Sequence, residues 1–367
     1  MENLKDKDLY DDLRIQLIID SNCNLACEYC VLLYKNQVYK EERSISYQVL
    51  DKYITFFIDN YDLLLKYYRK ITLTFFWWEP LLSNDKIIYI MDKLFHLGKI
   101  NFVIHTNWIL LNKKIINEYK KFDITRFSYI ISIDWQLDLM MKYRLKNKLH
   151  HFMILRWIKL LRENNIRFLF SPSIMKPTSN ELLNDYIYLY NKKPDGIIIN
   201  PVTAIYRVRE KESDKEIAKG VKLFLDYLRY NKKLSDRDII EFMWLPLNIN
   251  DYKDYLKFWF NLTGDIDWTI HAMSFAWQWF DDWTTYWRED LENITLWNVI
   301  FNKELLLKQL CRKDLYSDEK IWEITYNQQR RWTLPDWDVQ NMLANIILRY
   351  FRKFYLTWRK SRYGSSL

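Results

Sequence analysis

Glycine is scarce in this chain of 367 residues, which has only five. At the usual frequency of about 7%, a chain of this length would have about 26. Tryptophan is normally the rarer of the two residues, yet it occurs 17 times, and the two counts together approach the usual glycine count. Glycine is the residue that tolerates a positive φ in tight turns, so its scarcity raises the question of which residues occupy those turns.

Cysteine and long apolar segments are also scarce. There are four cysteines, and three of them fall within eight residues, which argues against a disulfide framework and favours a metal or redox site. No apolar run reaches 18 residues, and the charged, acidic start MENLKDKDLYDDLR does not resemble a signal or transit peptide. We therefore expect a cytoplasmic protein without a membrane partner. The net charge of +8 is spread along the chain, so a nucleic-acid partner is not expected.

Short apolar runs alternate with amphipathic segments through the first 205 residues. The amphipathic segments, such as 47–68 and 154–165, have helical periodicity. The apolar runs predict six strands, at residues 13–20, 71–76, 100–107, 124–134, 166–175 and 196–200. This order predicts an α/β fold, a partial (β/α)6 barrel of parallel strands with functional groups at their carboxyl ends.

The pattern changes after the sixth predicted strand. We expect residues 1–205 to form the core barrel and residues 206–254 to form a helical linker. Residues 255–367 begin with short, turn-rich segments and continue with helical ones, which predicts a smaller C-terminal α+β extension.

The cysteine motif directly follows the first predicted strand. Cys23, Cys27 and Cys30 have the spacing C-x3-C-x2-C. Three thiolates on one loop can hold three irons of a 4Fe-4S cluster and leave the fourth iron open to a ligand. The alternative is a structural zinc site, which needs a fourth ligand such as Cys311 or a histidine.

This cysteine array resembles that of the radical S-adenosylmethionine (SAM) family. WWEP at 77–80 lies where the family has Gly-Gly-Glu-Pro, and HTNWILL at 105–111 resembles His-Thr-Asn-Gly followed by apolar residues. SIDWQLDLMMKYR at 132–144 resembles Ser-Ile-Asp-Gly followed by Tyr-Arg. The resemblance covers residues 13–205 and implies a 4Fe-4S cluster on Cys23, Cys27 and Cys30. It also implies SAM, split reductively to give a 5′-deoxyadenosyl radical.

The resemblance also implies the residues that bind SAM. The backbone of Trp77 and Trp78 and the side chain of Glu79 would meet the amino group of SAM, while Ser132 and Arg144 would reach its ribose and carboxylate. For two of these residues an alternative stays open. The alternative for Ser132 is that it only ends a strand, and the alternative for Arg144 is that it only pairs with Asp138. His105 is either a proton relay or a structural residue, and no catalytic base is identified.

Tryptophan replaces glycine in each of these family motifs. Five tryptophans directly follow Asp or Asn, where glycine is the usual partner in a tight turn: Trp108, Trp135, Trp268, Trp283 and Trp337. Our hypothesis is that most tryptophans are glycines in the living cell, because UGA codons read there as glycine were translated as tryptophan. The alternative is a genuine Trp-rich protein with a filled, inactive site.

The C-terminal third resembles the SPASM group of radical SAM enzymes, which modify peptides and proteins. The resemblance is carried by DWTIHAM at 267–273 and by Trp297-Asn298. Only Cys311 lies in this part, so auxiliary clusters are not expected. The resemblance implies an oxidoreductase of the maturase type, related to anaerobic sulfatase-maturating enzymes, with an electron donor such as flavodoxin or ferredoxin. The alternatives are a radical SAM enzyme acting on a small molecule or RNA, and a non-catalytic cluster-binding protein.

Overall fold

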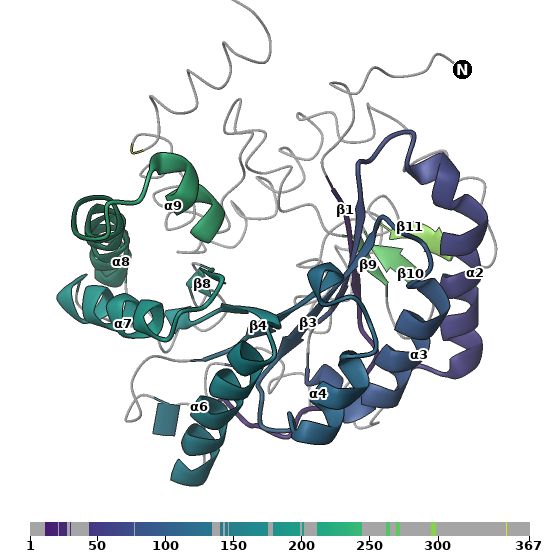
Figure 1. Ribbon diagram of the computed structural model, residues 1–367, viewed down its shortest axis with the longest axis horizontal. Helices are drawn as coiled ribbons and strands as arrows, with labels where there is room; N and C mark the ends of the chain where they lie inside the picture. The colour runs from purple at the N-terminus through teal and green to yellow at the C-terminus, as the bar shows by residue number, and fades with distance from the viewer. Residues whose placement is uncertain are drawn as a thin grey trace, which may run out of the picture.

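A sheet of parallel strands with helices packed along it forms the main body of the computed structural model (Figure 1). The residues that the structure describes are 12–20, 22–27, 30, 44–76, 78–133, 140–141, 144–145, 147–174, 179–198, 200–201, 211–243, 262–264, 269–271, 295–298 and 350.

Six neighbouring strands run parallel in chain order. They are β1 (Leu13–Leu17), β2 (Ile71–Phe75), β3 (Ile100–Thr106), β4 (Phe127–Ile131), β5 (Arg167–Phe170) and β7 (Gly196–Ile197). Each lies within one of the six apolar runs, so the predicted partial (β/α)6 barrel is confirmed. Three of the six runs hold more than one element. The run at 124–134 begins with a 3-10 helix, η3 (Ile124–Arg126), and the run at 166–175 is divided between β5 and β6 (Ser173–Ile174). The run at 196–200 is divided between β7 and β8 (Asn200–Pro201), which pairs with β6.

Helices connect the strands and cover the sheet. Figure 1 shows α2 (Tyr47–Leu64), α3 (Asn84–Leu94), α4 (Lys113–Tyr119) and α6 (Lys148–Glu163) beside the strands that they connect. The later helices are α7 (Ser179–Asn191), α8 (Lys211–Asp226) with the π-helical turn η4 (Tyr227–Asn231), and α9 (Asp236–Phe242). The last three elements lie within 206–254, where helix was expected.

Local capping explains where several helices begin. The side-chain oxygens of Ser46 and Asn112 accept hydrogen bonds from backbone N–H groups in the first turns of α2 and α4. Asn147 does the same for α6, and Ser235 forms a capping box with Asp238 at α9. These side chains satisfy donors that a helix start leaves without partners, which fixes the residue at which each helix begins.

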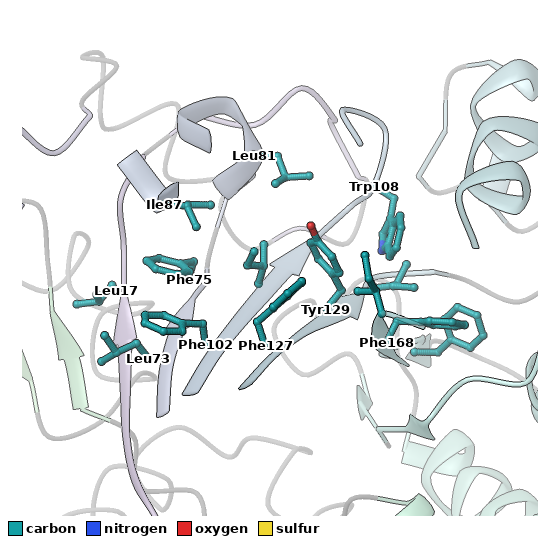
Figure 2. Packing of buried hydrophobic residues seen from close by; sticks show 14 of the residues in the cluster. Leu17, Leu73, Phe75, Leu81, Ile87, Phe102, Trp108, Phe127, Tyr129 and Phe168 are labelled. Carbon is teal, nitrogen blue, oxygen red and sulfur yellow. The ribbon is translucent and has the colours of Figure 1, made fainter. Parts of the chain in front are cut away.

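Aromatic side chains fill the space between the sheet and the helices. Figure 2 shows Phe75, Phe102, Phe127 and Phe168, one from each of four successive strands, among the buried side chains of the core. All four are almost completely buried. Alternate residues of a strand point to the same face, so these strands present one continuous apolar face to the helices. The core therefore holds the carboxyl ends of neighbouring strands in register.

Short strands from the last third of the chain extend the same sheet beyond β1. β9 (Leu262–Gly264) pairs parallel to β1, and β10 (Thr269–His271) and β11 (Thr295–Asn298) continue antiparallel. Most of residues 255–367 lies outside the described residues, so the extension as a separate unit stays a prediction. Within the described parts of the chain, no helix combines the length and apolar character that crossing a bilayer requires.

Candidate functional site

Polar side chains gather where the parallel strands end. Glu79 follows β2, His105 and Thr106 close β3, and Ser132 follows β4. The cysteine loop follows β1 on the same edge of the sheet. Carboxyl ends of parallel strands are where barrels of this kind hold their functional groups, so the predicted site residues come from the expected edge.

Glu79 is fully buried at the centre of this edge. Its carboxylate accepts hydrogen bonds from the Leu81 N–H at 3.0 Å, the Thr106 hydroxyl at 2.6 Å and the Asn107 N–H at 2.7 Å. Its own N–H donates to the carbonyl of Asn22 at 3.0 Å. Glu79 thus joins the ends of β2 and β3 to the cysteine loop. Burial raises the pKa of Glu79 to about 7, although these donors and the charge of Arg144 favour the ionised form.

Replacing Glu79 by glutamine is expected to destabilise the fold by about 1–3 kcal/mol at pH 5, because the amide nitrogen cannot accept the Asn107 N–H. The difference should narrow as the pH rises. The folded pKa of about 7 lies above the ordinary value of 4.5, so the contribution of Glu79 to stability falls between about pH 4.5 and 7, whereas glutamine does not titrate. Urea denaturation of both proteins at pH 5 and pH 8 measures this difference. A difference that widens at pH 8 would contradict the prediction.

The cysteine loop carries three thiols in different surroundings. Cys27 is buried, Cys30 is half-buried and Cys23 is the most exposed residue of the three, although its sulfur faces the protein. The Cys30 N–H donates to the Cys27 carbonyl at 2.9 Å, and the Leu25 N–H approaches the Cys23 sulfur at 3.5 Å. Desolvation raises the pKa of Cys23 to about 12, and Glu79, Cys27 and Cys30 add to this rise. A bound cation would oppose this rise and favour the thiolate of Cys23.

The donor set of the loop fits an iron-sulfur cluster better than a closed zinc site. Three cysteines on one loop supply three soft ligands and leave one metal position open. Among the described residues, no three or more His, Cys, Asp or Glu side chains are gathered around one metal position. Cys311, the proposed fourth zinc ligand, lies outside the described residues.

His105 and Ser132 form a pair across β3 and β4. The Nε2 atom of His105 lies 2.9 Å from the Ser132 hydroxyl, and the imidazole stacks on Phe76 with 4.7 Å between ring centroids. The Ser132 N–H donates to the Thr106 carbonyl at 3.0 Å. Desolvation, with a smaller contribution from Arg144, lowers the pKa of His105 to about 3, so the imidazole is neutral at pH 7. This environment favours the structural interpretation of His105 over a proton relay.

Arg144 is a buried cation beside the same groups. It donates to the Ser173 hydroxyl at 3.2 Å, and its charge lowers the pKa of both Glu79 and His105. Asp138, its alternative partner, lies outside the described residues. Sequence reasoning missed Ser173, Thr106 and Asn107 as members of this site. The available signal was their position, since all three lie at or after strand ends.

Two of the tryptophans at glycine positions have a backbone conformation that favours glycine. Trp78 has φ 20° and packs against the buried Ile18, as Phe76 and Cys30 also do. Trp108 has φ 72° and is fully buried beside Tyr129 (Figure 2), and its indole N–H has no hydrogen-bond partner among the residues that the structure describes. A positive φ is costly for residues with a side chain. These observations support the glycine hypothesis, which stays a prediction. Trp77 lies outside the described residues.

No family model matches the chain. In sequence, it is similar to the radical SAM cyclopropyl synthase TigE from Paramaledivibacter caminithermalis, with 23% identity over 218 residues. The match covers 53% of this chain and 42% of the relative, so it spans less than half of that protein's length.

Solved structures with the same fold include two proteins bound to SAM. The structure of anSMEcpe with bound AdoMet and Cp18Cys peptide has a TM-score of 0.58 and 13% identity, and the match covers 95% of this chain and 99% of that chain. Streptococcus suis SuiB bound to S-adenosylmethionine has a TM-score of 0.53 and 11% identity, over 75% of this chain and 63% of that chain. SuiB has also been solved with its precursor peptide SuiA. In sequence and in fold, this chain therefore resembles the radical SAM enzymes, as its cysteine spacing and strand-end motifs predicted.

Proposed function

We propose that this protein is a radical SAM enzyme whose cluster is held by Cys23, Cys27 and Cys30. The observation that carries the proposal is the contact of the cysteine loop with Glu79 and Asn107 at the ends of β2 and β3. A 4Fe-4S cluster with one open iron supplies the electron that splits SAM into methionine and a 5′-deoxyadenosyl radical. The sequence similarity to a radical SAM enzyme supports the same assignment.

The side chains around Glu79 have suitable chemistry for the polar groups of SAM. We assign the Glu79 carboxylate, with the backbone of Trp77 and Trp78, to the amino group of SAM. We assign Arg144 to its carboxylate, because a guanidinium can donate two parallel hydrogen bonds to a carboxylate. Ser132, which His105 and the Thr106 carbonyl orient, is assigned to the ribose. The buried setting excludes water and strengthens each of these contacts.

A peptide or protein is the proposed substrate. Support comes from the fold, which this chain shares with anSMEcpe in complex with a peptide and with SuiB in complex with its precursor peptide. An electron donor of the flavodoxin or ferredoxin type and a cytoplasmic location complete the proposal, because cluster reduction requires a reductant and a reducing compartment.

A non-catalytic cluster-binding protein is the second candidate function. One observation favours it, namely that Trp78 packs against the same buried residue, Ile18, as Cys30 of the cluster loop does. If this indole is native, it would hinder the approach of SAM to the open iron. The two candidates therefore differ in whether the reconstituted protein cleaves SAM.

Anaerobic reconstitution with iron and sulfide tests the proposal. Chain purified from the native host should bind about four irons and, with dithionite and SAM, release methionine and 5′-deoxyadenosine. Cys27→Ala should abolish both properties. Cys311→Ala is the matched control, because this cysteine lies outside the motif, and it should retain both. An intact cluster with no more 5′-deoxyadenosine than the Cys27→Ala protein would refute the enzyme and leave the non-catalytic candidate.

A further inference from the structure

Asn107 connects the end of β3 to two other parts of the site. It directly follows Thr106, the last residue of the strand, and is only 6% exposed. Its backbone N–H donates to Glu79 at 2.7 Å, and its side-chain oxygen accepts the Ile109 N–H at 3.1 Å. Because a backbone N–H can only donate, the Ile109 contact identifies which atom of the Asn107 amide is oxygen. The amide nitrogen must therefore point the other way, toward the cysteine loop.

The amide nitrogen of Asn107 makes two contacts with this loop. It donates to the side-chain oxygen of Asn24 at 2.7 Å and lies 3.6 Å from the Cys23 sulfur, within the range of a hydrogen bond to sulfur. The Leu25 N–H, the other donor at this sulfur, belongs to the loop itself. Asn107 thus contacts the Cys23 side chain from the end of the sheet, in addition to the backbone hydrogen bond from Glu79 to Asn22.

We propose that Asn107 is a positioning residue that anchors the cysteine loop and raises the reduction potential of the cluster bound there. This inference rests on the proposed function. A hydrogen bond donated to a cysteinate sulfur stabilises negative charge, and it does so most in the reduced state, which carries one more electron. The contact with Asn24 holds the loop so that Cys23 keeps its place when the cluster binds.

Two variants test the hydrogen bonds that the Asn107 amide nitrogen donates separately from the other contacts of this residue. Asn107→Ala removes both donated hydrogen bonds without adding charge. Asn107→Asp removes them as well, but keeps an oxygen for the Ile109 N–H. Both variants keep the backbone N–H that Glu79 accepts. Asn112→Asp is the matched control, because Asn112 makes the same kind of contact, to the Ile115 N–H at 3.0 Å, at the start of α4.

The readouts are the affinity for iron, the midpoint potential followed by electron paramagnetic resonance, and hydrogen exchange of residues 22–27 in the iron-free protein. Asn107→Ala should bind iron about tenfold more weakly, have a more negative potential and exchange faster in this loop. Asn107→Asp should have a still more negative potential. Asn112→Asp should match the parent in iron affinity, midpoint potential and hydrogen exchange. A lower thermal stability of Asn107→Ala with the parent's potential and loop exchange would show a merely structural role and overturn the inference.

The failure of the proposed function has a different signature. If the parent protein binds no cluster, the proposed function fails and the effect on potential fails with it, whereas hydrogen exchange still tests the anchor. If the parent cleaves SAM and Asn107→Ala has the parent's iron affinity, potential and exchange rates, only the inference about Asn107 is refuted.

Discussion

Replacing Trp77 and Trp78 together by glycine is expected to raise reductive SAM cleavage by about 100-fold or more over the chain with both tryptophans. Trp78 and Cys30 pack against the same buried residue, Ile18, so the indole lies on the side of the cluster loop where SAM would approach. Displacement of reacting groups by about 1 Å can cost about 100-fold in rate, and an indole would displace SAM by more than that. The measurement is 5′-deoxyadenosine formed with dithionite in the two reconstituted proteins.

The control for this experiment is Cys27→Ala in the chain with both glycines, which should return the product to background. The tryptophan-containing and glycine-containing proteins must have equal iron content. The comparison then measures how well SAM reaches the cluster and not how well the cluster assembles. A glycine-containing chain that has an intact cluster and forms no more product than the tryptophan-containing chain would contradict the prediction.

Replacing Trp108 by glycine is expected to change the free energy of unfolding by about 1 kcal/mol or less. Truncating a buried tryptophan in an ordinary core costs about 3–5 kcal/mol. At position 108 the loss is offset, because glycine relieves the strain of φ 72°, which costs about 1–3 kcal/mol. It also removes a buried N–H without a partner, which costs a further 1–3 kcal/mol or so. Urea denaturation of the two proteins measures the difference.

Trp157 is the matched control for this prediction. It is also buried with an unpaired indole N–H, but it lies within α6 and is not among the residues with positive φ. Removal of the indole N–H has the same effect at both positions, but Trp157→Gly relieves no positive φ and places glycine in a helix, so it should lose about 2–4 kcal/mol more than Trp108→Gly. Equal losses for Trp108→Gly and Trp157→Gly would show that the conformation at 108 does not favour glycine.

The sequence predicted the main sheet well because its strands are continuous apolar runs. Ile100–Thr106, for example, matches the run at 100–107 almost to the residue. The short strand β9 was not predicted as a neighbour of β1, since three residues carry no periodic signal and the pairing joins Ile15 to Leu262 across most of the chain. Pairings between residues so far apart are decided by tertiary packing.

The candidate site was predictable in its residue types but not in its contacts. The cysteine spacing and the resemblance of WWEP to Gly-Gly-Glu-Pro were enough to propose Cys23 and Glu79 as site residues. Glu79 accepts hydrogen bonds from Thr106 and Asn107. These contacts depend on how far β2 and β3 extend past one another. That Arg144 reaches Ser173 likewise depends on the fold, because the two residues are 29 apart in the chain.

The account depends most on the residues that the living cell places at positions 78 and 108. Both positions have positive φ, which a native glycine would explain and a native tryptophan would not. Mass spectrometry of the peptides covering residues 71–86 and 100–112, from protein made in its native host, tests this directly. The account predicts the masses with glycine at 77, 78 and 108. Masses with tryptophan at all three would contradict it and favour a cluster-binding protein with a filled site.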